Sequence, residues 1–295
     1  MYKYEYNSLH DLLSLAEKEQ TTLSDIVVRH EVESSEVVEE KVRAMMDSRL
    51  DVFQESIDAG MSDPGKSVSG LVGGDAHKLA ESTPTLLGPL AHKAAIYALA
   101  VSEANAKMFK IVACPTAGSC GIVPAVMMAA AETLDVSREA MVNALFIASG
   151  IGAVVSHNAT VAGAVGGCQA ECGSGAAMAA GAAVDVLGGT PEQVGHAVAI
   201  VFKNMLGLVC DPVAGLVEVP CIKRNGGAAA QALLAAELAL AGITSFIPAD
   251  EAIDAMKSVG DRLPCTLKET AEGGLAQTPT ALAWAQAYFA ADGKI

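Results

Sequence analysis

Aromatic residues and positive charges are scarce in this sequence. Aromatic side chains make up only 4% of the 295 residues, although hydrophobic residues make up 52%. Alanine and glycine must therefore fill much of the interior, which suits closely approaching helices better than a sheet sandwich built on large side chains. The formal net charge is −15, so nucleic-acid phosphates and anionic lipids would be repelled. We expect neither nucleic acid nor a membrane as a partner.

An export signal and a convincing membrane span are also lacking. Residues 8–20 have the pattern of a short amphipathic helix rather than the unbroken apolar core of a signal peptide. Two apolar stretches, residues 144–155 and 228–247, are the candidates for a span. The first is too short, and the second is mostly alanine with one Gln and one Glu. We expect both to be buried helices of a cytoplasmic protein.

Helical spacing recurs along the chain, whereas no long alternating strand pattern is found. Thr190 is followed by Pro191 and Gln193, which is the signature of a capping box at a helix start. Ser137 is a good N-cap for a helix that should end near Ser149. The other expected helices lie at residues 8–20, 38–53, 92–108 and 124–131.

No long linker or fixed-period repeat divides the chain. Residues 1–60 are charged and read as an N-terminal helical segment. Residues 61–295 read as alanine-rich helices separated by glycine loops, with cysteines at the loop edges. We therefore predict a mainly α protein, a single compact domain rich in alanine and glycine, with glycine-rich active-site loops. One continuous domain over residues 1–295 is the simplest organisation.

Residues 60–67 match the letters of a phosphate-binding loop, G-x-x-x-x-G-K-S. In such a loop Lys66 would meet the outer phosphates and Ser67 would hold magnesium. The motif should follow a buried strand, but residues 50–59 carry polar side chains on a helical period. A chance match is the better explanation, and a nucleotide hydrolase stays as the rival class of enzyme.

Seven cysteines form no disulfide framework, because their number is odd and their spacing irregular. Cys210 and Cys221 close a segment whose two prolines and glycine allow a stiff loop to return on itself. Cys168 follows a glycine-rich stretch where the backbone can approach a bulky ligand. No spacing matches the paired C-x-x-C units of zinc sites. The residues alone leave a metal or cluster site and inert buried thiols both open.

Five motifs follow one another within residues 66–276. They are Ser69-Gly-Leu-Val-Gly-Gly74, Pro115-Thr-Ala-Gly-Ser-Cys-Gly121, Asn158-Ala-Thr160, Gly167-Cys-Gln169 and Cys210-Asp-Pro-Val-Ala-Gly-Leu-Val-Glu-Val-Pro-Cys221. Together they closely resemble the alpha part of bacterial iron–sulfur L-serine dehydratases, and the last motif is highly specific. The resemblance implies that Cys168, Cys210 and Cys221 hold a 4Fe–4S cluster and leave one iron for the substrate.

The resemblance also implies the reaction. L-serine would lose the Cα proton and the hydroxyl group, with the open iron acting as a Lewis acid for the leaving hydroxyl. The resulting aminoacrylate would tautomerise and hydrolyse to pyruvate and ammonia. Residues 61–295 would then be the catalytic domain.

Several side chains are candidates for substrate contacts. The loops at Ser69, Gly70 and Thr116, Ala117, Gly118, Ser119 offer amides and hydroxyls for the substrate carboxylate. Asn158 could orient the amino or hydroxyl group. His157 is the candidate base, although a satisfied core histidine is the commoner outcome in an apolar surrounding. Lys78, beside His77, is the alternative, and Lys223 and Arg224 offer positive charge or form a solvated pair.

Two family features are missing from the sequence. The Ser-Ser-Ser-His-Thr motif of the beta region does not occur, so a separate beta chain is the expected partner and could supply a catalytic histidine. The C-terminal cysteine that can occupy the fourth iron in single-chain members is also absent. Cys172 lies outside the motif, Cys114 and Cys120 are expected to pack near the site, and Cys265 has no assigned place. The rival functions are another cluster lyase, such as an L-cysteine desulfidase, and a cluster-bearing sensor or scaffold.

Overall fold

Several helices begin at a residue whose side chain caps the first turn. In the computed structural model, which describes residues 2–291, the Ser8 and Ser137 side chains each accept the hydrogen bond expected of an N-cap. Thr190 and Gln193 form the predicted capping box. The described residues contain no strand, so the prediction of a mainly α fold is confirmed. The elements are α1 (Leu9–Glu19), α2 (Leu23–Ser35), α3 (Glu39–Ser62), α4 (Asp75–Glu81), α5 (Pro89–Ala106), α6 (Ile122–Leu134), α7 (Arg138–Asn158), α8 (Gly163–Gly166), α9 (Cys168–Val186), α10 (Pro191–Met205), η1 (Val213–Gly215), α11 (Cys221–Leu240), α12 (Ala249–Arg262), η2 (Cys265–Leu267), η3 (Gly274–Gln277) and α13 (Pro279–Ala291).

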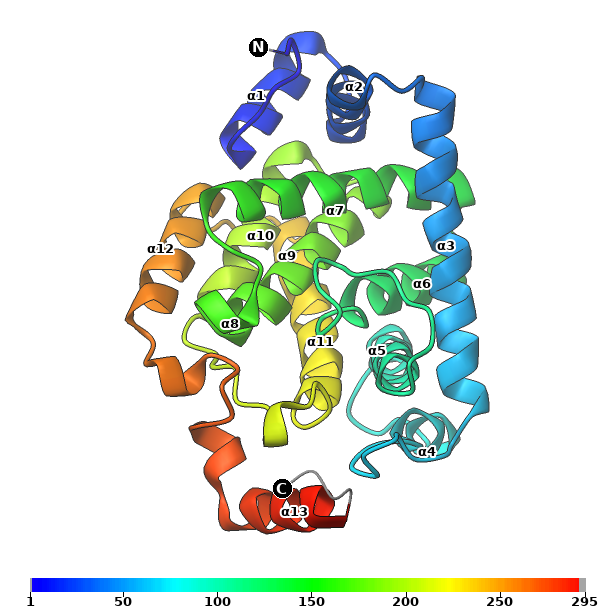
Figure 1. Ribbon diagram of the computed structural model, residues 1–295. Helices are drawn as coiled ribbons and strands as arrows, with labels where there is room; N and C mark the ends of the chain where they lie inside the picture. The colour runs from blue at the N-terminus through cyan, green and yellow to red at the C-terminus, as the bar shows by residue number, and fades with distance from the viewer. Residues whose placement is uncertain (1, 292–295) are drawn as a thin grey trace.

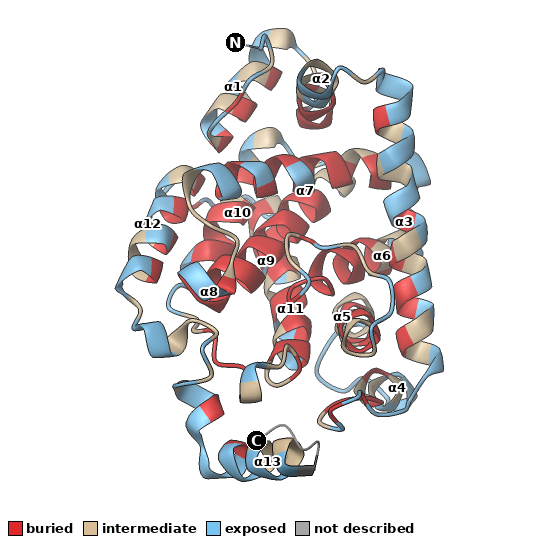
Figure 2. Ribbon diagram, viewed as in Figure 1, coloured by how far each residue is buried: buried red, intermediate tan, exposed pale blue. Residues whose placement is uncertain are grey.

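Helix α9 is the centre of the molecule. Its residues from Cys168 to Val184 are all buried, and helices α6, α7, α10 and α11 pack against it. Figure 2 shows this burial as red on α9, with red also on the sides of α7 and α10 beside it. Because α9 is built largely of alanine and glycine, its neighbours can approach its backbone closely, as the composition predicted.

Helix α7 is longer than the sequence indicated. It continues to Asn158 rather than ending near Ser149, although it contains two glycines that weaken a helix. The two glycines make room for neighbouring helices: a Cβ at Gly150 would lie 2.7 Å from Val27 Cγ2, and one at Gly152 would lie 3.1 Å from Met178 Sδ. Tertiary packing therefore overrides the local preference.

By length and composition, α7 is also the one described helix that could cross a membrane. Of its most apolar window, 61% is buried inside the molecule, and a core helix passes the same test. The second apolar stretch, residues 228–247, lies within α11 up to Leu240, and the chain then turns at Gly242. Many α11 residues are buried too.

The first three helices share their apolar core with the rest of the chain. One cluster of buried side chains extends from Tyr6 to Met256. Figure 1 shows α1 and α2 above the horizontal α7, and α3 running down one side of the molecule. At the opposite end, α13 packs against η1 and η3. Element η1 lies between Cys210 and Cys221, so α13 touches the segment that joins these two cysteines.

Candidate active site

Four cysteines gather near the first residues of α9 and α11. Cys168 and Cys172 lie on the first turns of α9, Cys221 begins α11, and Cys210 precedes η1. All four are buried. The Sγ atoms of Cys168 and Cys172 are 3.3 Å apart. The structure thus brings the three cysteines of the sequence prediction into one region and adds a fourth.

The thiols influence one another's ionisation. Burial raises the pKa of Cys221 to about 12, and a charge on Cys168 raises it as well. The pKa of Cys210 is raised by burial and by the same neighbour. In contrast, the hydrogen bond between Cys168 and Cys172 and the nearby Arg224 guanidinium lower the pKa of Cys168. Cys168 is therefore the thiol that ionises most readily. Its charge raises the pKa of both Cys210 and Cys221, because it lies near them.

Local backbone geometry fixes each sulfur. Cys168 follows Gly167, whose φ of +79° is a left-handed conformation that glycine adopts freely. Cys168 and Cys221 are the first residues of their helices, where the helix dipole favours a thiolate. The Cys210 N–H donates to the Leu267 carbonyl at 2.9 Å, and the Cys210 carbonyl accepts from the Glu269 N–H at 2.7 Å.

A glycine of α8 lies directly against Cys210 and Glu171. A Cβ at Gly163 would lie 3.0 Å from Cys210 Sγ and 3.3 Å from Glu171 Oε2. Within residues 2–291, no group of three His, Cys, Asp or Glu side chains converges on a single metal ion. A four-iron cluster attaches its thiolates to different irons, so the sulfurs need not meet at one point. The gathered, buried thiols fit such a cluster.

Arg224 supplies a positive charge next to the thiols. Its guanidinium donates to Asp211 Oδ1 and to the Val209 carbonyl, each at 2.8 Å. The pair is shielded from solvent, since 18% of the Arg224 side chain and 4% of the Asp211 side chain are exposed. Lys223 instead points to the surface and pairs with Asp75 at 2.8 Å. The two adjacent cations therefore have different environments.

The loop at residues 115–121 lies against the cysteines. Asn225 on α11 is fully buried and holds this loop. Its amide donates to the Gly118 carbonyl at 2.7 Å and to the Cys221 carbonyl at 2.9 Å, and accepts from the Gly121 N–H at 3.0 Å. One asparagine therefore ties the predicted substrate loop to a predicted cluster ligand.

Hydroxyl groups of this loop have partners on other segments. The Thr116 hydroxyl donates to Glu171 Oε1 at 2.5 Å. The buried Ser119 hydroxyl donates to the Cys114 carbonyl at 3.2 Å. Ala117 and Gly118 complete the turn between them. The backbone of residues 116–119 is thus held near the cysteines.

Ser69 is bound to the cysteine segment. Its hydroxyl donates to Glu218 Oε2 at 2.6 Å, and the Ser67 hydroxyl donates to the same oxygen at 2.7 Å. Glu218 lies between Cys210 and Cys221, so these bonds join the two loops. The Ser69 hydroxyl hydrogen is already engaged here, and the neighbouring Gly70, with a φ of +77°, is exposed.

The candidate bases lie at the surface. His157 is exposed in the last turn of α7, so it is no core histidine. The Asn158 amide donates to the Asn7 carbonyl at 2.5 Å and to the Val154 carbonyl at 3.1 Å. The Lys78 side chain is 71% exposed and pairs with Asp75 at 3.3 Å. Asn158 thus hydrogen-bonds to backbone carbonyls, and Lys78 pairs with a carboxylate, rather than with the cysteine thiols.

The family model described as "Serine dehydratase alpha chain" matches residues 18–276. The chain belongs to this family. It is 49% identical to "Probable L-serine dehydratase, alpha chain" of Bacillus subtilis (strain 168), over 93% of this chain and 92% of that protein. It is 42% identical to "L-serine dehydratase, alpha chain" of Peptoniphilus asaccharolyticus, over 93% and 95%.

Some longer relatives are named L-serine dehydratase without the words "alpha chain". "L-serine dehydratase 2" of Escherichia coli (strain K12) is 35% identical over 92% of this chain, which covers 62% of that protein. The serine dehydratase alpha-chain family thus includes proteins of this length and segments of larger ones. The resemblance found in the sequence motifs is confirmed.

Three polar residues of this serine dehydratase family member were missed at the sequence level. Glu171, Glu218 and Asn225 are buried beside the cysteines. Burial raises the pKa of Glu171. Helical spacing could have revealed Glu171, because it follows Cys168 by three residues and lies on the same face of α9. Glu218 and Asn225 depend on contacts between distant segments, which spacing does not reveal.

The phosphate-loop interpretation is wrong. Residues 50–59, where a strand is required, lie within α3, which continues to Ser62. The Ser67 hydroxyl, which would hold magnesium, donates to Glu218 instead. Lys66 is exposed.

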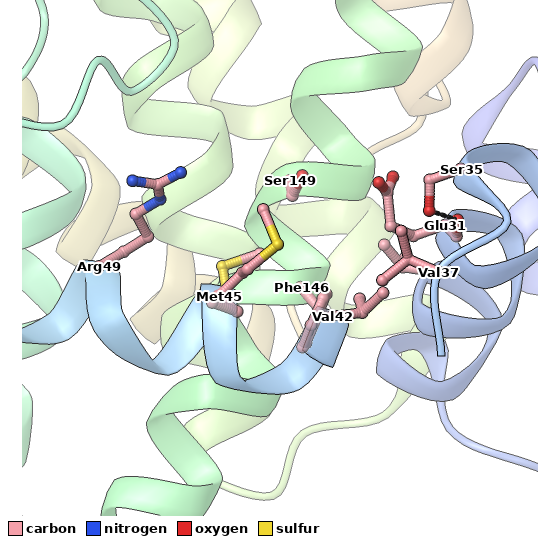
Figure 3. A pocket seen from close by; sticks show the side chains of 10 residues that line it. Glu31, Ser35, Val37, Val42, Met45, Arg49, Phe146 and Ser149 are labelled. Carbon is pink, nitrogen blue, oxygen red and sulfur yellow. Dashed lines mark hydrogen bonds between the residues drawn. The ribbon is translucent and has the colours of Figure 1, made fainter. Parts of the chain in front are cut away.

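A separate cavity of about 280 Å³ opens between α2, α3 and α7. In Figure 3, Glu31 and Arg49 lie at its two ends, and Met45 and Phe146 lie between them. Its lining contains neither cysteine nor histidine. It takes no part in the site built around the thiols.

Proposed function

We propose that this protein is the catalytic alpha chain of a cytoplasmic iron–sulfur L-serine dehydratase, which acts with a separate beta chain to convert L-serine to pyruvate and ammonia. The observation that carries the proposal is the gathering of Cys168, Cys210 and Cys221 as buried thiols, in a chain of this family. The "alpha chain" in the names of relatives of the same length supports a separate partner.

The three thiols are the proposed ligands of a 4Fe–4S cluster. When bound, such a cluster with one iron free of protein ligands supplies a Lewis acid for the leaving hydroxyl. The Arg224 guanidinium offsets part of the thiolate charge, because it lies close to Cys168. Cys172 hydrogen-bonds to Cys168 and supports that ligand's position.

The chain's loops would bind the substrate carboxylate. The backbone amides of Thr116 to Ser119 form the proposed anion site, because Asn225 holds this loop against Cys221. Burial of the surrounding side chains excludes water, which strengthens each polar contact with the substrate. Ser69 contributes by fixing its loop to Glu218.

The acceptor of the Cα proton is assigned to the beta chain. His157, Asn158 and Lys78 remain predictions as catalytic groups, but their surface positions favour an acceptor from outside this chain. A base must reach the proton directly or through one water molecule.

The test is anaerobic co-purification of both chains, followed by iron and sulfide analysis and a pyruvate assay with L-serine. Cys168→Ser, Cys210→Ser and Cys221→Ser should each lose iron and pyruvate formation. Cys265→Ser is the matched control, because Cys265 is exposed, and it should keep both.

Full activity in an iron-free preparation would refute the cluster. Sulfide release from L-cysteine without pyruvate formation from L-serine would indicate a desulfidase instead. Bound iron with neither activity would favour a sensor or scaffold.

A further inference from the structure

Glu171 places a buried carboxylate beside the cysteines. The residue is 8% exposed and lies one turn after Cys168 on α9. Its Oε1 atom accepts a hydrogen bond from the Thr116 hydroxyl at 2.5 Å. Among the described residues, no side chain or amide donates to Oε2, and no cation pairs with the carboxylate.

Two glycines lie directly against the carboxylate. A Cβ at Gly118 would lie 2.6 Å from Glu171 Oε1 and 2.9 Å from Oε2. A Cβ at Gly163 would lie 3.3 Å from Oε2 and 3.0 Å from Cys210 Sγ. The unpaired oxygen and the sulfur of a proposed cluster ligand therefore both lie next to Gly163.

Other carboxylates around the site already have donors. Asp211 accepts from Arg224 and from the Leu275 N–H. Glu218 accepts from two serine hydroxyls. Asp75, further out, pairs with two lysines. Glu171 differs from these three because it is buried with a single neutral donor.

Glu269 is the rival. It is half-buried, and its charge acts on both Glu171 and Cys210. Its side chain lies on the loop after η2, however, where its backbone N–H is bonded to Cys210. Glu171 is held by a helix and by Thr116, so its carboxylate is the better ordered of the two.

We propose that the Glu171 carboxylate binds the α-ammonium group of the amino acid substrate. This inference rests on the proposed function, because it takes the substrate to bind beside Cys210. A buried carboxylate is costly unless a cation pairs with it, and a zwitterionic amino acid brings one. Thr116 holds Oε1, which leaves Oε2 for the ammonium. Glu171 would thereby select amino acids over hydroxy acids that have no ammonium group.

The experiment compares wild-type holoenzyme with Glu171→Gln, each purified anaerobically with the beta chain. Glutamine keeps an oxygen for Thr116 but removes the charge. We expect the KM for L-serine to rise about 10- to 100-fold, as is typical when a charged hydrogen-bond partner is lost. Calorimetric binding of L-alanine, which has the ammonium but no leaving hydroxyl, should weaken by a similar factor. The inhibition constant of 3-hydroxypropanoate, which lacks the ammonium, should not rise.

This contrast separates ammonium binding from a structural role, which would weaken both ligands alike. Iron content is measured for each variant to show that the thiol site is intact. Should Glu171→Gln fail to fold, Thr116→Val provides the same comparison. We then expect a smaller loss of affinity, for L-alanine but not for 3-hydroxypropanoate.

Unchanged L-alanine binding, or equal weakening of both ligands, overturns the inference. Weakened L-alanine binding in Glu269→Gln, with unchanged binding in Glu171→Gln, also overturns it. Failure of the proposed function is visible beforehand, because wild-type enzyme would then neither form pyruvate from L-serine nor bind L-alanine.

Discussion

The position of Gly118 shows how a missing side chain can matter to a site. Its Cα faces the Glu171 carboxylate, and the loop that carries it is held by Asn225. An added methyl group would meet the flexible end of a side chain rather than rigid backbone. The backbone can therefore keep its position, whereas the Glu171 carboxylate must move.

We expect Gly118→Ala to raise the KM for L-serine about tenfold or more while the melting temperature falls only slightly. Displacing a binding group by a fraction of an ångström is enough for such a loss. Steady-state kinetics and thermal unfolding would measure the two effects. Gly227→Ala is the matched control, because nothing lies within 4 Å of a Cβ there, and it should leave the KM unchanged. Wild-type kinetics in Gly118→Ala would contradict the prediction.

At the scale of single residues, the sequence indicates the gathered thiols more readily than the polar side chains around them. Cys168, Cys210 and Cys221 could be found because they stand in specific motifs. The residue type of His157 and its neighbour Asn158 predict a base there, but His157 is exposed at the end of α7. The spacing of Glu171 from Cys168 is informative, because it places both residues on one face of α9.

Among the elements, helix starts were predictable and helix ends were less so. A cap such as Thr190 acts within three residues, so its signal is local. The end of α7 depends on Val27 and Met178, which are distant in sequence. The cysteine segment and the Ser69 loop were recognised by motif, but their connection through Glu218 needed the tertiary structure.

Asp185 is an unfavourable feature of α9. Burial raises its pKa to about 6, and it lies in the last turn of the helix, where the dipole disfavours negative charge. Its pKa is raised on folding, so ionisation destabilises the folded state increasingly as pH rises from about 4 to 6. Below that range the carboxyl is protonated in both states and the cost disappears.

We therefore expect Asp185→Asn to stabilise the protein at pH 7.5, by roughly 1–2 kcal/mol after allowance for partial exposure. The gain should vanish near pH 3.5. Urea unfolding of both proteins across this pH range is the measurement. A gain that does not depend on pH would show that ionisation is not the cause.

For the whole molecule, the shared core implies that the N-terminal helices unfold with the rest. Leu12 on α1 is fully buried in the cluster that extends to Met256. Replacing such a leucine with alanine removes buried apolar surface and leaves a cavity.

We expect Leu12→Ala to lower the free energy of unfolding by about 2–4 kcal/mol and to preserve a single transition. Leu134→Ala is the control, because Leu134 is 43% exposed and should cost less than about 1 kcal/mol. Calorimetry and circular dichroism would follow both variants. A separate early transition in Leu12→Ala would instead mark α1–α3 as an independent unit.

The alanine and glycine of α9 have a consequence for the rigidity of the site. These residues have no rotamers to lose, so burying them costs almost no side-chain entropy. Backbone positions alone then determine how α9 sits among its neighbours, and there is little side-chain rearrangement to absorb a displacement. Cys168, Glu171 and Cys172 all project from the start of this helix. Their spacing is thus set by a rigid backbone before any ligand arrives, which reduces the ordering cost of binding.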